Sequence, residues 1–502
     1  MKNRIAFLSI LLAALLFSCT NNAPHNLNEK DVEKYLNEQE SIYESMCIKA
    51  GKEVWEYYSD SSENSMSEYK NLFAGFLNND SLIQNINEWN EKIKDFKDTA
   101  LMRRLELWKN VLSCAQVDFN PEIIQLQNKL ESLFADYPSD NGTGAELENS
   151  VRELIQLRNK RAIQSGYENY AYMVLQNTGI DIHWFENLIR IIAARSLEPY
   201  KQFIREQISD KKPVLKYDSL RQYIIQAYRI NEEPVIADGH KEKLLYETLS
   251  NIGIDIHALP IELKITNLPP GIGGFGNCIH IPDDFRVVAM KELSFYHLLH
   301  EIGHGLHWTN VAVHSPMLKG YEWCTGNLSD LYCEAMAETI AQFSQNGLWL
   351  EKNGFDDRTI GNIKRQRNLI YPVYLRLRLV NTLFEIELYK HPEKDPAVIK
   401  KELYAKYLLT HKDFSNQSNL IMLSFVSYPI YEQNYLIADI IAWQIHEYLK
   451  NHYGEDYPFN PNVGEFLKRE LWRNGELRDW KNRILTATGK ELDVEGYLKE
   501  KL

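Results

Sequence analysis

The sequence has little of what a nucleic-acid-binding protein needs. Its 502 residues include 69 Asp and Glu against 56 Lys and Arg, which gives a formal net charge of -13 at pH 7. Phosphate backbones are bound by clustered cations, so this balance argues against a nucleic-acid partner. With 44% hydrophobic and 25% charged residues, the composition is that of a globular protein with a sizeable core.

Cysteine is also scarce, and its spacing excludes two common scaffolds. The chain has six cysteines, and no two of them stand in the CxxC spacing of a structural zinc site. Once Cys19 is set aside, the other five are scattered over a long chain, which is no disulfide framework. They are Cys47, Cys114, Cys278, Cys324 and Cys333. We expect them to be buried thiols.

The first residues predict a targeting signal. A positively charged start precedes an apolar run from Ile5 to Phe17, which is too short for a stable membrane span. The run leads into the sequence LFSC, which ends at Cys19 and resembles a bacterial lipobox. This resemblance implies cleavage before Cys19 and lipidation of its thiol. The alternative is an ordinary secretory signal with an incidental cysteine.

The signal divides the chain into three predicted parts. Residues 1–18 form a lipoprotein signal peptide, residues 19–30 a polar lipidated tether, and residues 31–502 the folded domain. The predicted location is the bacterial cell envelope. There the chain would be anchored to a membrane through Cys19 and would face the periplasm.

Proline and glycine are sparse between Val32 and Tyr246, where apolar residues recur at three- and four-residue spacing. This pattern predicts helices. Between Leu263 and Val288 a Gly-rich entry leads into alternating β-prone residues, although the glycines could also form turns alone. Helices are predicted again after Lys291. We therefore expect a mostly α fold, with a large helical two-walled cleft and a small β-hairpin or sheet beside the central motif.

The strongest chemical signal is the segment HEIGH from His300 to His304. Positions i and i+4 of a helix lie on one face, so His300 and His304 can bind one metal ion. Glu301 falls beside them, where its carboxylate can take a proton from an attacking water. The surrounding residues 291 to 307 predict one continuous helix. The pattern predicts a zinc site for peptide hydrolysis, with Glu301 as the general base.

A catalytic zinc ion usually takes a third protein ligand. Residues 331 to 348 predict a long helix in which Glu334 and Glu338 stand at i and i+4. We expect Glu334 to be the third ligand, and Glu338 to accept the free ring N–H of a liganding histidine. The reverse assignment stays open. His297 and His307 flank the motif, and we interpret them as neighbours of the site.

Together these motifs resemble the helical zinc peptidases that include angiotensin-converting enzyme and, more distantly, thimet oligopeptidase and oligoendopeptidase. In converting enzymes a second helix supplies the ligand glutamate and then an acidic residue, which matches Glu334 and Glu338. The separation from His304 to Glu334 is somewhat longer here, which an inserted loop at residues 314 to 327 would explain. The resemblance covers much of the chain from Glu153 onward.

The segment that begins at Tyr435 is similar to the converting-enzyme helix whose first tyrosine hydrogen-bonds the oxyanion. The resemblance assigns that role to Tyr435, since a phenol can donate to charge that grows in the transition state. Tyr431 is a candidate substrate contact or a packing residue. Converting enzymes also have a lysine and a histidine before this tyrosine, which help hold the C-terminal carboxylate of the peptide. Residues 420 to 428 contain neither.

The leading hypothesis is a zinc-dependent peptidase of the gluzincin type, acting on short peptides as an oligopeptidase or a dipeptidyl carboxypeptidase. The missing lysine and histidine leave the position of the cut open. The alternatives are a single-residue carboxypeptidase of related helical fold and a noncatalytic lipoprotein that binds peptides. An aminopeptidase is disfavoured, because no GxMEN-type sequence precedes the motif. The expected partners are Zn2+, short peptides and a membrane.

Overall fold

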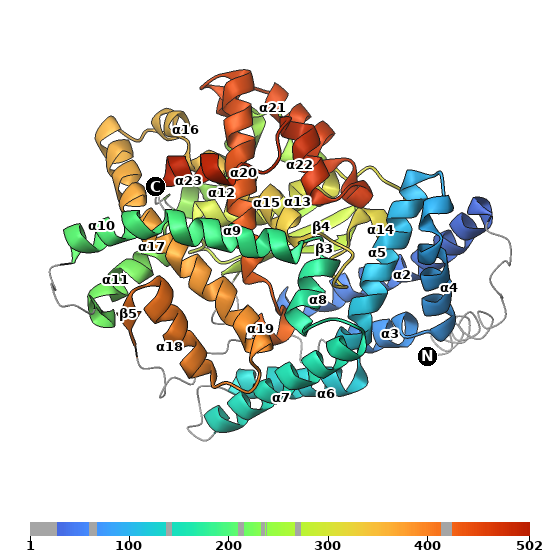
Figure 1. Ribbon diagram of the computed structural model, residues 1–502. Coiled ribbons are helices and arrows are strands. Elements are labelled where there is room, and N and C mark those ends of the chain that lie inside the picture. Colours follow the sequence, from blue (N-terminus) through green and yellow to red (C-terminus); the bar gives the residue numbers. More distant parts are fainter. Residues whose placement is uncertain are drawn as a thin grey trace.

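The computed structural model describes residues 28–59, 68–136, 143–208, 215–231, 236, 238–266, 273–412 and 424–502. Over these residues the chain is mostly helical, with a small three-stranded sheet in its middle (Figure 1). The prediction of a mostly α fold with a small sheet is confirmed. Cys19 and the expected signal peptide lie outside the described residues.

The first half of the chain is built from helices, as its apolar spacing predicts. Several begin at a side-chain cap: Asn79 accepts from the backbone N–H of Leu82, and Asp181 from that of Trp184. The helices before the sheet are α2 (Glu29–Ser59), α3 (Glu68–Leu77), α4 (Asp80–Glu91), α5 (Thr99–Asp118), α6 (Pro121–Asp136), α7 (Thr143–Gln164), α8 (Tyr170–Asn177), α9 (Ile182–Arg195), α10 (Leu197–Gln207), α11 (Tyr217–Tyr228) and α12 (Lys241–Asn251).

Over its described residues, the second half resumes with helices after the sheet and adds the short strand β5 (Thr410–His411), which pairs in parallel with β1 (Leu215–Lys216). The helices of this half are α13 (Phe295–Thr309), α14 (Pro316–Lys319), α15 (Asp330–Ala341), α16 (Gly347–Lys352), α17 (Asp357–Lys390), α18 (Pro396–Tyr407), α19 (Ser424–Ser427), α20 (Glu432–Tyr453), α21 (Asn462–Phe466), α22 (Trp480–Thr488) and α23 (Val494–Lys501).

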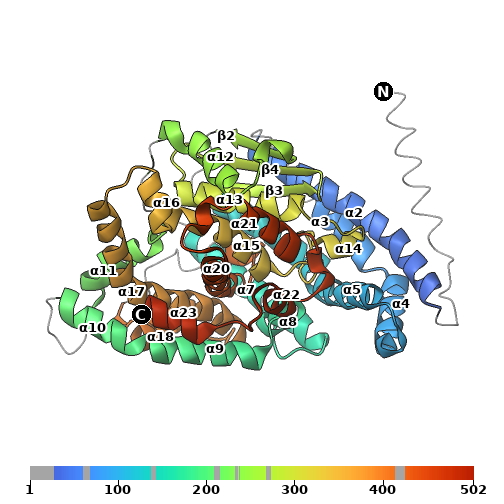
Figure 2. The ribbon, with the colours of Figure 1, turned by 90° about the horizontal axis from the view of Figure 1, so that it is seen from above.

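The central sheet consists of β2 (Ile261–Ile265), β3 (Gly274–His280) and β4 (Asp284–Ala289), in the order β2-β4-β3. Strand β2 runs parallel to β4, and β3 runs antiparallel to it. The sheet lies beside α13, with α2 running along its other side (Figure 2). The sheet therefore stands next to the helix that carries the HEIGH segment.

Helix α2 packs closely against the edge strand β3. A Cβ atom at Gly51 would lie 2.7 Å from the carbonyl oxygen of Cys278, so only glycine allows this approach. The side-chain amide of Asn277 donates to the Gly51 carbonyl at 2.8 Å. Trp55 of α2 also packs with Ile279 of β3 and with β4 in a small apolar cluster. The N-terminal helix thus supports the strand from the side opposite α13.

The two motif helices are shorter than the sequence predicts. Helix α13 begins at Phe295 rather than at Lys291, because the Ser294 hydroxyl caps it by accepting from the backbone N–H of His297. Helix α15 ends at Ala341 rather than near Leu348. These boundary predictions were wrong. A 3-10 turn follows α15, and Asn346 then caps the separate helix α16.

Helices α13, α15 and α20 form the centre of the second half, with α15 packed against both of the others (Figures 1 and 2). All three belong to one hydrophobic core that runs through the described residues. Within the described part of the chain, no helix has both the length and the apolar composition that a membrane span requires.

Candidate metal centre

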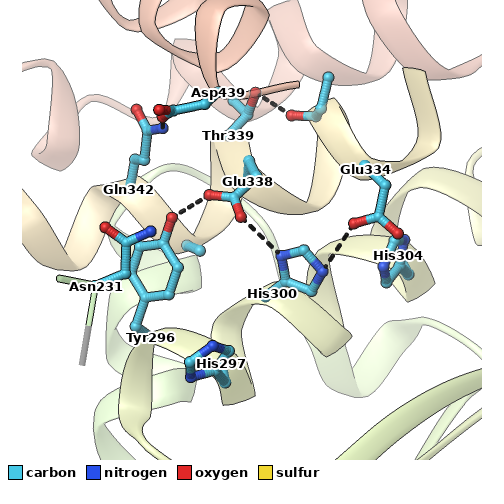
Figure 3. A network of polar contacts seen from close by, with 12 residues as sticks. Asn231, Tyr296, His297, His300, His304, Glu334, Glu338, Thr339, Gln342 and Asp439 are labelled. Carbon is cyan, nitrogen blue, oxygen red and sulfur yellow. Dashed lines mark hydrogen bonds and ion pairs between the residues drawn. The ribbon is translucent and has the colours of Figure 1, made fainter. Parts of the chain in front are cut away.

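Close packing of α13 on α15 creates the centre. Gly303 lies in the middle of the HEIGH segment, and a Cβ atom there would lie 2.7 Å from the Cα of Ala337. The absence of a side chain lets the two backbones approach. As a result, Glu334 of α15 faces the two histidines of α13, and the sequence-predicted ligands come together in space (Figure 3).

His300, His304 and Glu334 form the one group of three or more potential ligands found among the described residues. One ligand atom from each residue lies within 4.8 Å of the others. The Nε2 atom of His300 lies 3.2 Å from Glu334 Oε2, and the two imidazole rings stand almost perpendicular at 89°. All three side chains are at least nine-tenths buried.

The far side of His300 contacts the second carboxylate of α15. Its Nδ1 lies 3.5 Å from Glu338 Oε1, so His300 stands between Glu334 and Glu338 (Figure 3). The Tyr296 hydroxyl donates to the other oxygen of Glu338. This chain of contacts fixes the orientation of the His300 ring and leaves Nε2 for a metal ion. The roles of Glu334 as a ligand and Glu338 as a partner of the His300 ring stay predictions.

The second histidine, His304, is oriented by a different neighbour. Its Nδ1 lies 3.2 Å from the Sγ of Cys333, the residue directly before Glu334. Burial lowers the pKa of His304 to about 4. Burial also opposes protonation of His300, but the carboxylates of Glu334 and Glu338 outweigh it and raise the pKa of His300 well above its usual value. His304 is thus held neutral, the form that binds metal.

The donor set fits a zinc ion. Two imidazoles and one carboxylate are a common protein ligand set of catalytic zinc, and they leave one position open. Glu334 Oε2 is buried, and apart from its ion-pair contact with His300 Nε2 it has no hydrogen-bond donor, which a buried carboxylate oxygen normally has. A cation between His300, His304 and Glu334 would satisfy this oxygen.

Glu301 is positioned by the edge strand of the sheet. Its Oε2 accepts a hydrogen bond of 2.6 Å from the backbone N–H of Gly276. A Cβ atom at Gly276 would lie 2.7 Å from the Phe285 ring, so the glycine lets β3 approach α13. Burial raises the pKa of Glu301 above its ordinary value. A carboxylate with a raised pKa is better suited to accept and return a proton near neutral pH.

Both predicted tyrosines lie near the ligand group. The Tyr431 hydroxyl donates to Glu334 Oε1 at 2.7 Å, so Tyr431 holds the carboxylate that faces the histidines. The ring of Tyr435 lies 5.5 Å from the ring of Tyr431. The pKa of Tyr435 is raised, first by burial and then by negative charges that include Glu334 and Glu301. Tyr435 therefore lies within electrostatic reach of both carboxylates.

The two flanking histidines have other roles. His297 Nδ1 lies 2.7 Å from the Ser294 hydroxyl at the helix cap. His307 is 1% exposed, and its Nε2 lies 3.4 Å from the Arg483 guanidinium. Burial lowers the pKa of His307 well below its usual value. Both residues are packing neighbours, as the sequence-based interpretation holds.

A cavity of about 330 Å3 adjoins the centre. Residues of the helices α2, α3, α5, α6, α7 and α8 line it, together with β3, the loop before α15, the first residue of α15 and the segment before α20. Gly276 and Tyr431 belong to its lining, and they contact Glu301 and Glu334 respectively. The cavity is therefore next to the residues that hold Glu301 and Glu334 in place.

Sequence reasoning missed several supporting groups. Tyr296 precedes His300 by four residues, so helical spacing could have placed it on the same face. The sequence predicts Cys333 only as a buried thiol and does not indicate its contact with His304. Glu385 of α17 accepts from the backbone N–H groups of Ile430 and Tyr431, and nothing in its local sequence indicates this contact.

The comparisons with known proteins point to one group of solved structures. No protein-family model and no curated protein matches the chain. Metallocarboxypeptidase 1 of Trypanosoma cruzi is 14% identical, with a TM-score of 0.68 over 94% of this chain and 99% of its own. An M32 carboxypeptidase from Deinococcus radiodurans R1 is 12% identical, with a TM-score of 0.67 over 93% and 97%.

A carboxypeptidase of Pyrococcus furiosus is 13% identical, with a TM-score of 0.63 over 96% of this chain and 100% of its own. At such identities the likeness establishes the fold. The structures named here are carboxypeptidases, so the finer resemblance to angiotensin-converting enzyme stays a prediction. The chain therefore has, over more than nine-tenths of its length, the fold of the M32 metallocarboxypeptidases.

Proposed function

We propose that the protein is a zinc-dependent peptidase that removes residues from the C-terminus of short peptides. The observation that carries this proposal is the grouping of His300, His304 and Glu334 beside Glu301. The fold adds support, since metallocarboxypeptidase 1 of Trypanosoma cruzi shares it along 99% of that enzyme's length.

Hydrolysis at this site would depend on the metal ion, on Glu301 and on the backbone N–H of Gly276. When bound by His300, His304 and Glu334, zinc supplies Lewis-acid polarisation of the peptide carbonyl and lowers the pKa of a water molecule. Glu301 accepts the proton of the attacking water and then returns it to the leaving amine. The Gly276 N–H holds the Glu301 carboxylate in place for both steps.

The tyrosines and Glu338 would act around this reaction. Tyr435 donates its phenolic O–H to the oxyanion that forms as water attacks. Tyr431 holds Glu334 through a hydrogen bond, and Glu338 orients the His300 ring. These supporting contacts keep the donor atoms in place while charge moves during the reaction.

A second candidate is a dipeptidyl carboxypeptidase or an oligopeptidase. It is favoured by the similarity of the helix from Tyr435 to the corresponding helix of converting enzymes. Residues 420 to 428 lack the lysine and histidine with which those enzymes hold a C-terminal carboxylate. Their absence argues against dipeptide release and leaves an oligopeptidase as the stronger form of this second candidate.

Mass spectrometry of the products from one defined decapeptide tests the proposal. The zinc-loaded protein should release single C-terminal residues, whereas dipeptides or internal cuts would support the second candidate. The variant Glu301→Gln should keep its zinc and lose activity by about a hundred- to ten-thousand-fold, because it removes the proton acceptor. The exposed Glu292→Gln is the matched control and should cleave normally.

Two results would contradict the proposal. A zinc-loaded Glu301→Gln variant with normal activity would exclude Glu301 as the base. If the zinc-loaded wild-type protein cleaved no peptide in a broad library, a noncatalytic peptide-binding role would be favoured instead.

We also propose that the chain is a lipoprotein of the bacterial cell envelope. The support is the apolar run from Ile5 to Phe17 and the LFSC sequence that ends at Cys19. A lipid at Cys19 would hold the peptidase at a membrane surface, where peptides of the periplasm would be its substrates.

A further inference from the structure

The geometry points to a binding site for a cationic group of the peptide, an ammonium or a guanidinium, in the cavity beside the metal centre. The acceptors would be Glu322 and Asp330, together with the side-chain oxygen of Asn277. This inference rests on the proposed function, because it takes the occupant of the cavity to be a peptide.

The cavity carries more negative than positive groups. Four carboxylates and two cations line it: Asp118, Glu131, Glu322, Asp330, Lys70 and Arg158. Lys70 forms an ion pair with Glu131 at 2.8 Å. The Arg158 guanidinium donates to backbone carbonyls of the α19 segment and interacts with the charge of Asp118. Both cations therefore already have a carboxylate of the cavity as a neighbour.

Glu322 and Asp330 lack such a partner. Among the described residues, no Lys or Arg lies within ion-pair distance of either side chain, and the charges that act on them are other carboxylates. Burial raises the pKa of Glu322 to about 8 and that of Asp330 to about 7, and mutual repulsion adds to the shift of Glu322. Ionising a half-buried carboxyl group without a counter-charge is costly, and a cationic ligand would favour the ionised form of both groups.

A third potential acceptor belongs to Asn277, which also lines the cavity. Asn277 is 1% exposed, and its side-chain N–H donates to Gly51, which fixes the direction of its oxygen. This Oδ1 atom is buried and has no hydrogen-bond partner. An ammonium has three N–H donors and a guanidinium five, so either can bond to several such acceptors at once. The aromatic ring of Trp323 lines the same space and suits the stem of a cationic side chain.

The site stands close to the reacting bond. Gly276, next to Asn277, donates to Glu301, and the charges of Glu301 and Glu334 act on Glu322. A cation held here would belong to a residue near the cleaved bond. Two parts of a peptide supply this chemistry: the side chain of Lys or Arg, and the free N-terminal amine.

Calorimetric binding of alanine-based hexapeptides to the zinc-loaded Glu301→Gln protein distinguishes these sources. A single lysine is placed at each position in turn, and each peptide is paired with its norleucine counterpart, which has a similar stem without the charge. Each pair is measured with a free and with an acetylated N-terminus. We expect a tenfold or larger gain in affinity for lysine over norleucine at one position, or for the free N-terminus over the acetylated one.

The variants Glu322→Gln and Asp330→Asn, built in the same Glu301→Gln background, identify the acceptors. Each should reduce the gain at least fivefold, whereas the exposed Glu351→Gln should leave it unchanged. Both substitutions replace a carboxyl group that is costly to ionise by a neutral amide, so the midpoint of thermal unfolding should equal or exceed that of the parent. Zinc content is measured on every variant, so that a loss of metal is not mistaken for a loss of the cation site.

Equal affinity for lysine, norleucine, free and acetylated peptides would overturn the inference. It would also be overturned if the gain persisted in both carboxylate variants. The proposed function is tested separately with the wild-type enzyme. If peptides are cleaved without any preference for a cation, this inference alone fails. If cations are preferred in binding but no peptide is cleaved, the catalytic proposal alone fails.

Discussion

At the scale of single residues, His446, which is not one of the proposed metal ligands, is kept neutral by burial. Its Nε2–H donates to the carbonyl of Thr339 in α15, and the Tyr457 hydroxyl donates to its Nδ1, both at 2.8 Å. Burial lowers the pKa of His446 to about 4. The neutral imidazole thus joins α20 to the helix that carries Glu334.

This depressed pKa predicts a specific loss of stability in acid. Below pH 6.5 the unfolded chain binds a proton at His446, while the folded protein does not bind it until about pH 4. The free energy of unfolding is therefore highest above pH 6.5. It decreases as the pH falls toward 4, by about 3 kcal/mol at most. Urea unfolding of wild type and His446→Gln between pH 4.5 and 7.5 checks this.

The variant should lose less stability than the wild type on acidification, although its stability at pH 7.5 should be lower. Parallel pH curves for the two proteins would contradict the prediction. The comparison isolates His446 because His304 and His307, whose pKa values are also lowered, are present in both proteins.

Several contacts at this scale could be predicted from the sequence and others could not. The spacing of His300, His304 and Glu334 follows from helix geometry, so the motif alone indicates them. The N–H of Gly276 is different, because a backbone donor has no sequence signature and its place depends on how β3 packs. Glu322 lies in the loop that the sequence suggested only as an insertion, and Asp330 is the first residue of α15.

At the scale of elements, the contact between α13 and α15 depends on one missing side chain. We predict that Gly303→Ala forces the helices apart, because its Cβ would lie 2.7 Å from the Cα of Ala337. Overpacking of this kind costs about 1–3 kcal/mol of stability. It should also weaken zinc binding, since Glu334 and the two histidines sit on opposite sides of this contact.

The matched control is Gly361→Ala in α17, where a Cβ atom would meet no other atom within 4 Å. Alanine is the better helix former, so this variant should gain about 0.5–1 kcal/mol. Urea unfolding and competition with a zinc-binding dye measure both variants. Equal effects of the two substitutions would show that Gly303 is not a packing requirement.

The turn before α20 could not be predicted from the sequence. Ile430 has a φ of 58°, a conformation that β-branched residues rarely adopt. The buried carboxylate of Glu385 accepts from the backbone N–H groups of Ile430 and Tyr431 and so stabilises the turn. This turn directs the Tyr431 hydroxyl toward Glu334. A strained conformation that depends on a distant acceptor leaves no local pattern in the sequence.

At the scale of the whole molecule, the helical fold followed from apolar spacing, whereas its arrangement did not. The periodicity before Tyr246 predicts separate helices but not which of them line the cavity. The position of α2 beside β3 depends on Gly51, an unremarkable glycine within a helix. Long-range packing of this kind is decided by shape, which single-sequence patterns do not encode.

Metal binding should stabilise the whole chain. The ligands come from α13 and α15, so a bound ion favours the folded state over the unfolded one. Zinc at a hundredfold excess over its dissociation constant should raise the free energy of unfolding by about 2.7 kcal/mol. A chelator should remove this gain, and Glu334→Gln should abolish the zinc response. Wild-type unfolding that does not depend on zinc would contradict the assignment.

The proposed anchor predicts how the whole molecule partitions in cells. In a host that processes bacterial lipoproteins, the wild-type chain should be recovered with membranes, whereas Cys19→Ser should lose its lipid and become extractable without detergent. Fractionation with detection by antibody measures this. The control is Cys47→Ser, which alters a buried thiol and should stay membrane-bound. A membrane-bound Cys19→Ser protein would refute lipidation at this residue.

The contact of α2 with β3 can form only after a long delay during synthesis of the chain. The Asn277 amide and the Gly51 carbonyl are separated by 226 residues. At about 5–20 residues per second, the ribosome makes the strand roughly 10–45 s after the helix. Trp55 of α2 therefore lacks its apolar contacts with Ile279 and Val288 until more than half of the chain has been made. The strand that steadies Glu301 is completed late, and the nascent chain must be kept from aggregating until then.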